Sequence, residues 1–112
     1  MKVYVDSSTK KACFVFEGQE PITVPYPEPV TVNVGEYKAV IAALGEAVRR
    51  QLGHVDLFTD SQLVVEQVKG NWKCCKMHLL PLRDYARTLL RLVEGTIQWI
   101  PREENIAGKV LG

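Results

Sequence analysis

The chain has 112 residues, which favours one domain over residues 1–112 with an ordinary hydrophobic core. Hydrophobic residues make up 46% and charged residues 24%, which is typical of a soluble globular protein. No apolar run reaches the length of a membrane span, and the first residues lack the apolar core of a signal peptide. We therefore expect a cytoplasmic protein without membrane contact, and a monomer. The net charge of +1 indicates no class of partner.

Three strand-like segments open the chain. Residues 2–6 and 12–17 have the residue types of strands, and the short polar link between them predicts a hairpin. Residues 21–33 predict a third, broken strand. Its prolines place it at an edge or in a turn, because proline cannot donate to a sheet ladder. We expect these three strands to pair antiparallel.

Helical and strand-like segments alternate in the rest of the chain. Apolar residues at helical spacing predict a first helix from Glu36 to about Leu52, and an apolar run predicts a buried strand over 55–59. Further elements are predicted in this order: helices over 61–69 and 79–93, a strand over 96–100, and a short terminal helix from Asn105. This order predicts an open α/β fold, whose later strands join in parallel through right-handed crossovers.

Three acidic residues stand where strands end or a helix begins. Asp6 ends the first strand, Asp60 ends the fourth, and Glu36 opens the first helix. Sites in open α/β folds lie at the carboxyl ends of parallel strands, so the three acids are expected to converge. Clustered carboxylates repel one another and need a cation, and hard oxygen ligands suit Mg²⁺ or Mn²⁺. Each acid alone has a structural explanation as a turn or cap residue, but the combination favours a metal site.

Several motifs occur in an order that resembles a known family. They are YVDSS at 4–8, TVNVGEY at 31–37, FTDSQLVVEQVKGNW at 58–72 and WIPREEN at 99–105. Together they resemble the ribonuclease H superfamily, in the compact form found in archaeal and bacterial proteins. The resemblance implies a five-stranded mixed sheet of order 3-2-1-4-5, with the first three strands antiparallel and helices on both faces. It also implies divalent-metal-dependent cleavage of the RNA strand of an RNA–DNA hybrid.

The resemblance assigns roles to individual residues of the acid site. Asp6 would bridge two metal ions, and Glu36 and Asp60 would bind the second of them. Arg102 lies in the loop where family members carry a mobile histidine or arginine near the product phosphate. These four residues are therefore the expected catalytic residues, with Mg²⁺ or Mn²⁺ as the cofactor.

Other residues are expected to bind the hybrid or another nucleic-acid duplex. Asn33 and Gln62 match family positions that contact the minor groove, where RNA displays its 2′-hydroxyls. Trp72, Lys73 and Lys76 lie in a basic segment that would meet the phosphates of the DNA strand. A solvated helix face is the alternative reading of the basic residues, and a rim residue covering a helix junction is the alternative for Trp72.

One position departs from the family motif. After Asn105, the family motif continues with two variable residues, a small residue and then an aspartate, but this chain has Lys109 in place of the aspartate. Three explanations are open. The first is an impaired member that keeps hybrid binding, in which Lys109 pairs with Asp6. The second is a working enzyme that recruits Glu103 or Glu104, or that tolerates a weak first metal site. The third is a local shift of the terminal segment, with an acid supplied by a longer chain or a partner. The rival functions are a non-catalytic hybrid-binding module, a protein-interaction module, and an enzyme of the same fold that acts on another nucleic acid, as related nucleases and transposition enzymes do.

The cysteines and one tryptophan are assigned structural roles. Cys13, Cys74 and Cys75 are an odd number in a chain without an export signal, which indicates free thiols. The spacing around Cys74 and Cys75 matches no standard zinc motif. Trp99 alternates with Ile97 on the last predicted strand, so we assign Trp99 to sheet packing rather than to nucleic-acid contact.

Overall fold

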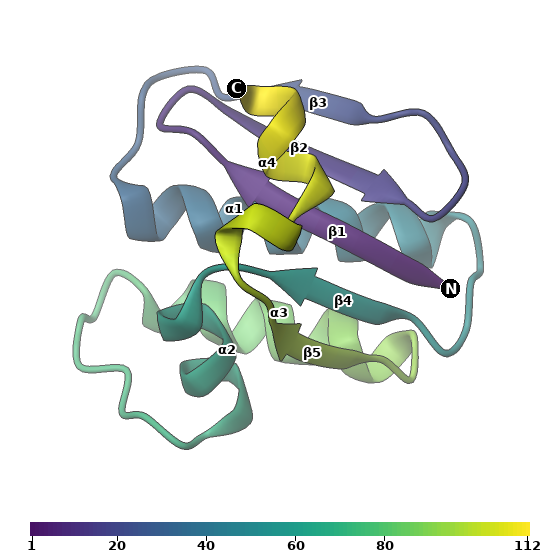
Figure 1. The fold of residues 1–112 in the computed structure, drawn as a ribbon. Helices are drawn as coiled ribbons and strands as arrows, with labels where there is room; N and C mark the ends of the chain where they lie inside the picture. Colours follow the sequence, from purple (N-terminus) through teal and green to yellow (C-terminus); the bar gives the residue numbers. More distant parts are fainter.

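The computed structural model describes all 112 residues and contains a five-stranded sheet of order β3-β2-β1-β4-β5 (Figure 1). The strands are β1 (Lys2–Ser7), β2 (Lys11–Phe16), β3 (Ile22–Pro25), β4 (Asp56–Thr59) and β5 (Thr96–Trp99). The first three pair antiparallel, and β4 joins β1 and β5 in parallel. The predicted fold class and strand order are confirmed.

The helices lie on both faces of the sheet. They are α1 (Val32–Arg49), α2 (Gln62–Lys69), α3 (Leu80–Leu92) and α4 (Ile106–Leu111), with a 3₁₀ turn η1 (Arg102–Glu104) before α4. In Figure 1, α1 and α3 lie behind the sheet, and the short α4 crosses its front. The main core fills the space between the sheet and α1 to α3, and a small second cluster lies under α4. None of the helices has the length and apolar character that crossing a membrane requires.

The third strand is shorter than predicted, and this changes the start of the first helix. The strand ends at Pro25 rather than at residue 33, because the following prolines supply no ladder donors. Thr31 is the N-cap of α1, and its hydroxyl accepts a hydrogen bond from the Val34 N–H at 3.4 Å. The helix therefore begins at Val32, and Glu36 lies in its second turn instead of opening it.

A buried asparagine fixes α4 to the sheet. The Asn105 side chain is fully buried, and its Nδ2 donates to the Val5 carbonyl of β1 at 2.9 Å. Its Oδ1 accepts a hydrogen bond from the Ala107 N–H at 3.2 Å and so caps the helix. One side chain thus places the terminal helix over the strand that carries Asp6.

We expect Asn105→Ala to lower the free energy of unfolding by about 2 to 3 kcal/mol, because it removes two buried hydrogen bonds and leaves their partners unsatisfied. Urea denaturation measures this loss. Asn71→Ala is the matched control, because the exposed Asn71 amide donates only to Glu66 at 3.0 Å. Equal losses in the two variants would contradict a special role for Asn105.

Candidate active site

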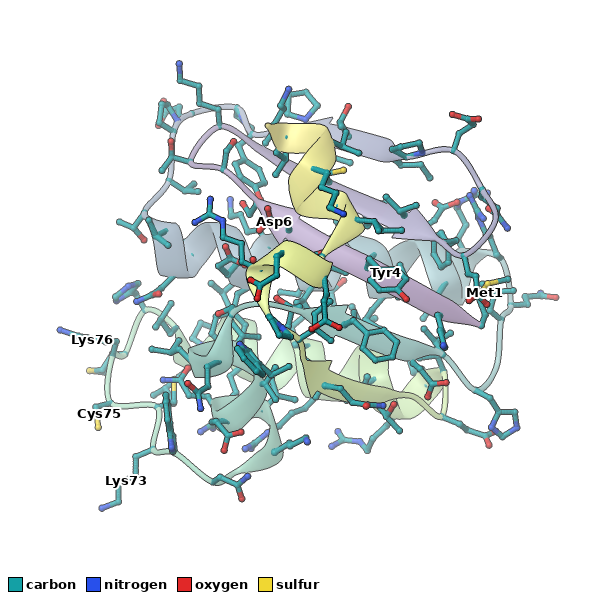
Figure 2. The ribbon with its side chains drawn as sticks, in the orientation of Figure 1. Met1, Tyr4, Asp6, Lys73, Cys75 and Lys76 are labelled. Carbon is teal, nitrogen blue, oxygen red and sulfur yellow. The ribbon has the colours of Figure 1, made fainter.

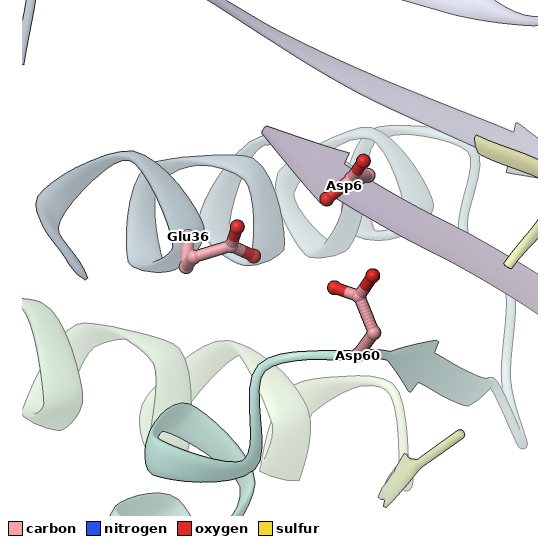
Figure 3. Close-up of side chains that lie close together, drawn as sticks. All are labelled: Asp6, Glu36 and Asp60. Carbon is pink, nitrogen blue, oxygen red and sulfur yellow. The ribbon is translucent and has the colours of Figure 1, made fainter. Parts of the chain in front are cut away.

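Three carboxylates converge at one edge of the sheet. Asp6 comes from β1, Glu36 from the second turn of α1, and Asp60 directly follows β4 (Figure 3). Each offers a carboxylate oxygen, and these oxygens all lie within 4.8 Å of one another. Asp6 and Glu36 are each only 9% exposed. The acids line a cavity of about 260 Å³ together with the β1–β2 turn, Val32 and Arg102.

Burial and mutual repulsion disfavour the charged forms of these acids. The pKa of Glu36 rises to about 8, first because the carboxyl is buried and then because Asp6 and Asp60 carry the same charge. Burial also raises the pKa of Asp6, while the Ser7 backbone N–H opposes the rise and Asp60 adds to it. Arg102 acts in the opposite direction on both groups. The single guanidinium of Arg102 does not offset burial and mutual repulsion, so the pKa values of both groups stay raised.

One buried oxygen in the cluster has no partner. Glu36 Oε2 is inaccessible to solvent and makes no hydrogen bond, which is rare for a buried polar atom. A carboxylate oxygen of this kind, beside two more carboxylates, matches the ligands of a hard divalent cation. The residues present therefore fit Mg²⁺ or Mn²⁺.

Known proteins share this fold. A family model described as reverse transcriptase-like matches residues 8–111, nearly the whole chain. The chain belongs to the ribonuclease H superfamily. The crystal structure of RNase H1 from the halophilic archaeon Halobacterium salinarum is similar with a TM-score of 0.79 and 28% sequence identity. That match covers 98% of this chain and 92% of the archaeal chain.

A mycobacterial protein is also similar. The N-terminal RNase H domain of Rv2228c from Mycobacterium tuberculosis, solved as a fusion with maltose-binding protein, matches with a TM-score of 0.76 and 26% identity over 93% of this chain and 84% of that one. The curated sequence of this bifunctional protein is 38% identical over 76 residues, which is 67% of this chain. The chain spans about a fifth (21%) of the length of that curated relative.

The basic residue that lines the acid cavity is Arg102 rather than Lys109. Arg102 begins η1 and lines the acid cavity. Lys109 is exposed on α4, and none of the ion pairs in the protein includes it. The pairing of Lys109 with Asp6, one of the explanations considered for the altered motif, is therefore absent. Glu103 and Glu104 are exposed and do not line the cavity.

Gly108 is the residue of α4 that faces the acid site. A Cβ added to Gly108 would lie 3.0 Å from Asp6 Oδ2, whereas the Lys109 side chain starts about 100° further around the helix. The small residue expected before the motif's last position thus allows α4 to approach Asp6 closely. Position 109 adjoins the acid site without contributing an oxygen to it.

The predicted minor-groove residues lie at two helix N-termini. Asn33 is exposed in the first turn of α1, three residues before Glu36. Gln62 is the first residue of α2 and is also exposed, two residues after Asp60. Both amides therefore lie on chain segments that carry a carboxylate of the cluster.

The predicted phosphate-binding segment lies between α2 and α3. Trp72 is 45% exposed, and Lys73 and Lys76 are exposed as well. Figure 2 shows Lys73, Cys75 and Lys76 pointing outward from this loop and away from Asp6. No residue of the loop lines the acid cavity, so it forms a separate basic surface. All three cysteines of the chain are free thiols.

The assignment of Trp99 to sheet packing is wrong. Ile97 is buried, but Trp99 is 49% exposed, because it is the last residue of an edge strand. Its indole Nε1 donates to the Asp60 carbonyl at 3.2 Å. Trp99 therefore holds the backbone of a site acid, a role that no sequence motif signals. Tyr26 is a second supporting residue that no sequence motif indicates, and its hydroxyl lies between the segments that carry Asp6 and Glu36.

Proposed function

We propose that this chain is a divalent-metal-dependent ribonuclease H that cleaves the RNA strand of RNA–DNA hybrids. The observation that carries this proposal is the cluster of Asp6, Glu36 and Asp60, with carboxylate oxygens within 4.8 Å of one another and a partnerless oxygen on Glu36. Membership of the ribonuclease H superfamily supports the same reaction class. A relative that is named RNase H1 and covers nearly the whole chain adds to this support.

Asp6, Glu36 and Asp60 would hold the metal, which when bound supplies an activated water and charge stabilisation for the leaving oxygen. The chain's own residues prepare this site. Glu36 must lose its proton to ligate a cation, and its raised pKa means that metal and proton compete for it. Arg102 at the cavity places a planar cation where it can donate two hydrogen bonds to a phosphate.

The exposed amides and the basic loop would bind the substrate. Asn33 and Gln62 would contact the minor groove, where 2′-hydroxyls distinguish RNA from DNA. Lys73 and Lys76 would pair with phosphates of the DNA strand, with Trp72 packing against the backbone. In this proposal, the residues that recognise the RNA strand lie beside the acids, and the residues that bind phosphates without sequence preference lie on the loop.

A second candidate function is a non-catalytic hybrid-binding module. The observation that favours it is Lys109, which replaces the superfamily's last acid and points into solvent. This alternative keeps the substrate surface and loses the reaction. It therefore predicts salt-sensitive hybrid binding without cleavage, because phosphate contacts release counterions.

The two functions are separated by incubating the chain with a labelled RNA–DNA hybrid in Mg²⁺, in Mn²⁺ and in EDTA. We expect the parent to cut only the RNA strand, and only with metal. Asp60→Asn should cut at least about 100-fold more slowly, because it loses a charged ligand to the ion that stabilises the transition state. DNA–DNA and RNA–RNA duplexes of the same sequence are the substrate controls. Hybrid binding without cleavage would support the binding module, and neither binding nor cleavage would overturn both functions.

A further inference from the structure

Two hydroxyls and a carbonyl connect β1 to α1 beside the acids. The Ser7 Oγ lies 2.7 Å from the Tyr26 hydroxyl, and that hydroxyl donates to the Gly35 carbonyl at 3.0 Å. Ser7 directly follows Asp6, and Gly35 directly precedes Glu36. Each end of this bridge is therefore one residue away from a carboxylate of the cluster.

The bridge has little freedom to move. The Tyr26 N–H donates to the Lys10 carbonyl at 2.8 Å, which anchors the tyrosine to the β1–β2 turn. On the helix side, a Cβ at Gly35 would lie 2.7 Å from Ser7 Oγ and 3.1 Å from the Ser8 carbonyl oxygen. The absence of a side chain at Gly35 thus allows α1 to contact the turn, and the Ser7 hydroxyl fills the space.

No protein hydrogen bond joins the Asp6 and Glu36 carboxylates directly, and Glu36 Oε2 has no partner at all. Core packing holds α1 against β1, and the bridge adds a hydrogen-bonded link between the residues next to the two acids. Resting on the proposed function, which assigns these acids to a metal, we propose that Tyr26 is a positioning residue. Its hydroxyl sets the separation of Asp6 and Glu36 so that both can bind one divalent cation.

The test is a double-mutant cycle read out by Mn²⁺ binding to the full chain, measured calorimetrically without substrate. The variants are Tyr26→Phe, Ser7→Ala and the double variant, with Tyr85→Phe as the matched control because Tyr85 is exposed on α3. We expect each single variant to weaken Mn²⁺ binding about 5- to 10-fold. The double variant should lose no more than either single variant, because both changes break the same bridge. Tyr85→Phe should bind like the parent.

Hybrid cleavage measured on the same samples separates the possible failures. We expect Tyr26→Phe to cut slowly at limiting Mn²⁺ and to recover at saturating Mn²⁺, which a general loss of folding would not produce. If the parent binds Mn²⁺ and cuts, but Tyr26→Phe and Ser7→Ala both bind like the parent, the positioning role is overturned and the proposed function stands. Additive losses in the double variant would also overturn it. If the parent neither binds Mn²⁺ nor cuts, the proposed function falls, and the inference with it.

Discussion

Replacing Glu36 by glutamine is expected to stabilise the metal-free protein and to abolish its stabilisation by divalent metal. The Glu36 carboxyl is buried beside Asp6 and Asp60, one of its oxygens has no partner, and its pKa rises from 4.5 to about 8. A neutral amide removes the cost of burying this charge and can donate to the neighbouring carboxylates. Each pKa unit corresponds to about 1.4 kcal/mol, so we expect a gain of about 3 kcal/mol at pH 7.

The pH dependence follows from the direction of the pKa shift. Because the folded pKa of Glu36 lies above the unfolded value, the folded state binds more protons between pH 4.5 and about 8. The parent should therefore lose stability as pH rises through this window, with no further loss from Glu36 above it. Asp6 acts in the same direction, because its pKa is also raised. Glu36→Gln should remove most of the slope.

Urea denaturation in EDTA between pH 5 and pH 9 measures both effects, and a repeat in Mg²⁺ measures the response to metal. Ligands that bind only the folded state raise its stability by mass action, so Mg²⁺ should stabilise the parent but not Glu36→Gln. Glu28→Gln is the control, because Glu28 is exposed and lies outside the cavity. A Glu36→Gln variant less stable than the parent in EDTA would show that the carboxylate is not under repulsion.

Restoring an acid at position 109 is expected to strengthen the metal site. Lys109→Asp replaces a positive charge by a negative one on the helix whose Gly108 lies against Asp6. A change of two charge units next to Gly108, which contacts Asp6, favours a divalent cation. We expect Mg²⁺ to bind at least tenfold more tightly, which corresponds to about 1.4 kcal/mol. Cleavage of the hybrid at limiting Mg²⁺ should rise by a similar factor.

The matched variant is Lys109→Gln, which removes the positive charge without supplying a carboxylate. If Lys109→Gln gains as much as Lys109→Asp, the lysine acts only by repelling the cation. If neither variant differs from the parent, position 109 lies outside the metal site. In that case α4 contributes to the site only through the Gly108 contact with Asp6.

Much of the fold could be predicted because strand and helix patterns are local. Asp6 and Asp60 each end an apolar strand, so a prediction of two neighbouring parallel strands places both acids at one edge. The predicted start of α1 is wrong because Val32 and its β-branched neighbours have the residue types of a strand. The role of Thr31 as a cap can be recognised only once the helix is known. Element type therefore followed from the pattern, but the boundary did not.

The supporting residues of the site could not be predicted, because their contacts join distant parts of the chain. Tyr26 is 19 residues from Ser7, and Trp99 is 39 residues from the Asp60 carbonyl to which it donates. Tyr26 belongs to none of the family motifs, and the motif that Trp99 opens implies no partner for its side chain. Their roles depend on which segments pack together, which is a property of the tertiary structure.

The loop between α2 and α3 has a consequence for experiments on substrate approach. Cys13 and Cys74 are buried, whereas Cys75 is exposed between Lys73 and Lys76. Thiol reagents react with accessible thiolates, so the unmodified sequence offers one preferred attachment point for a fluorophore or spin label. That point lies in the middle of the basic loop (Figure 2). A label attached to Cys75 of the unmodified chain would therefore report on the surface where we expect the DNA strand to bind.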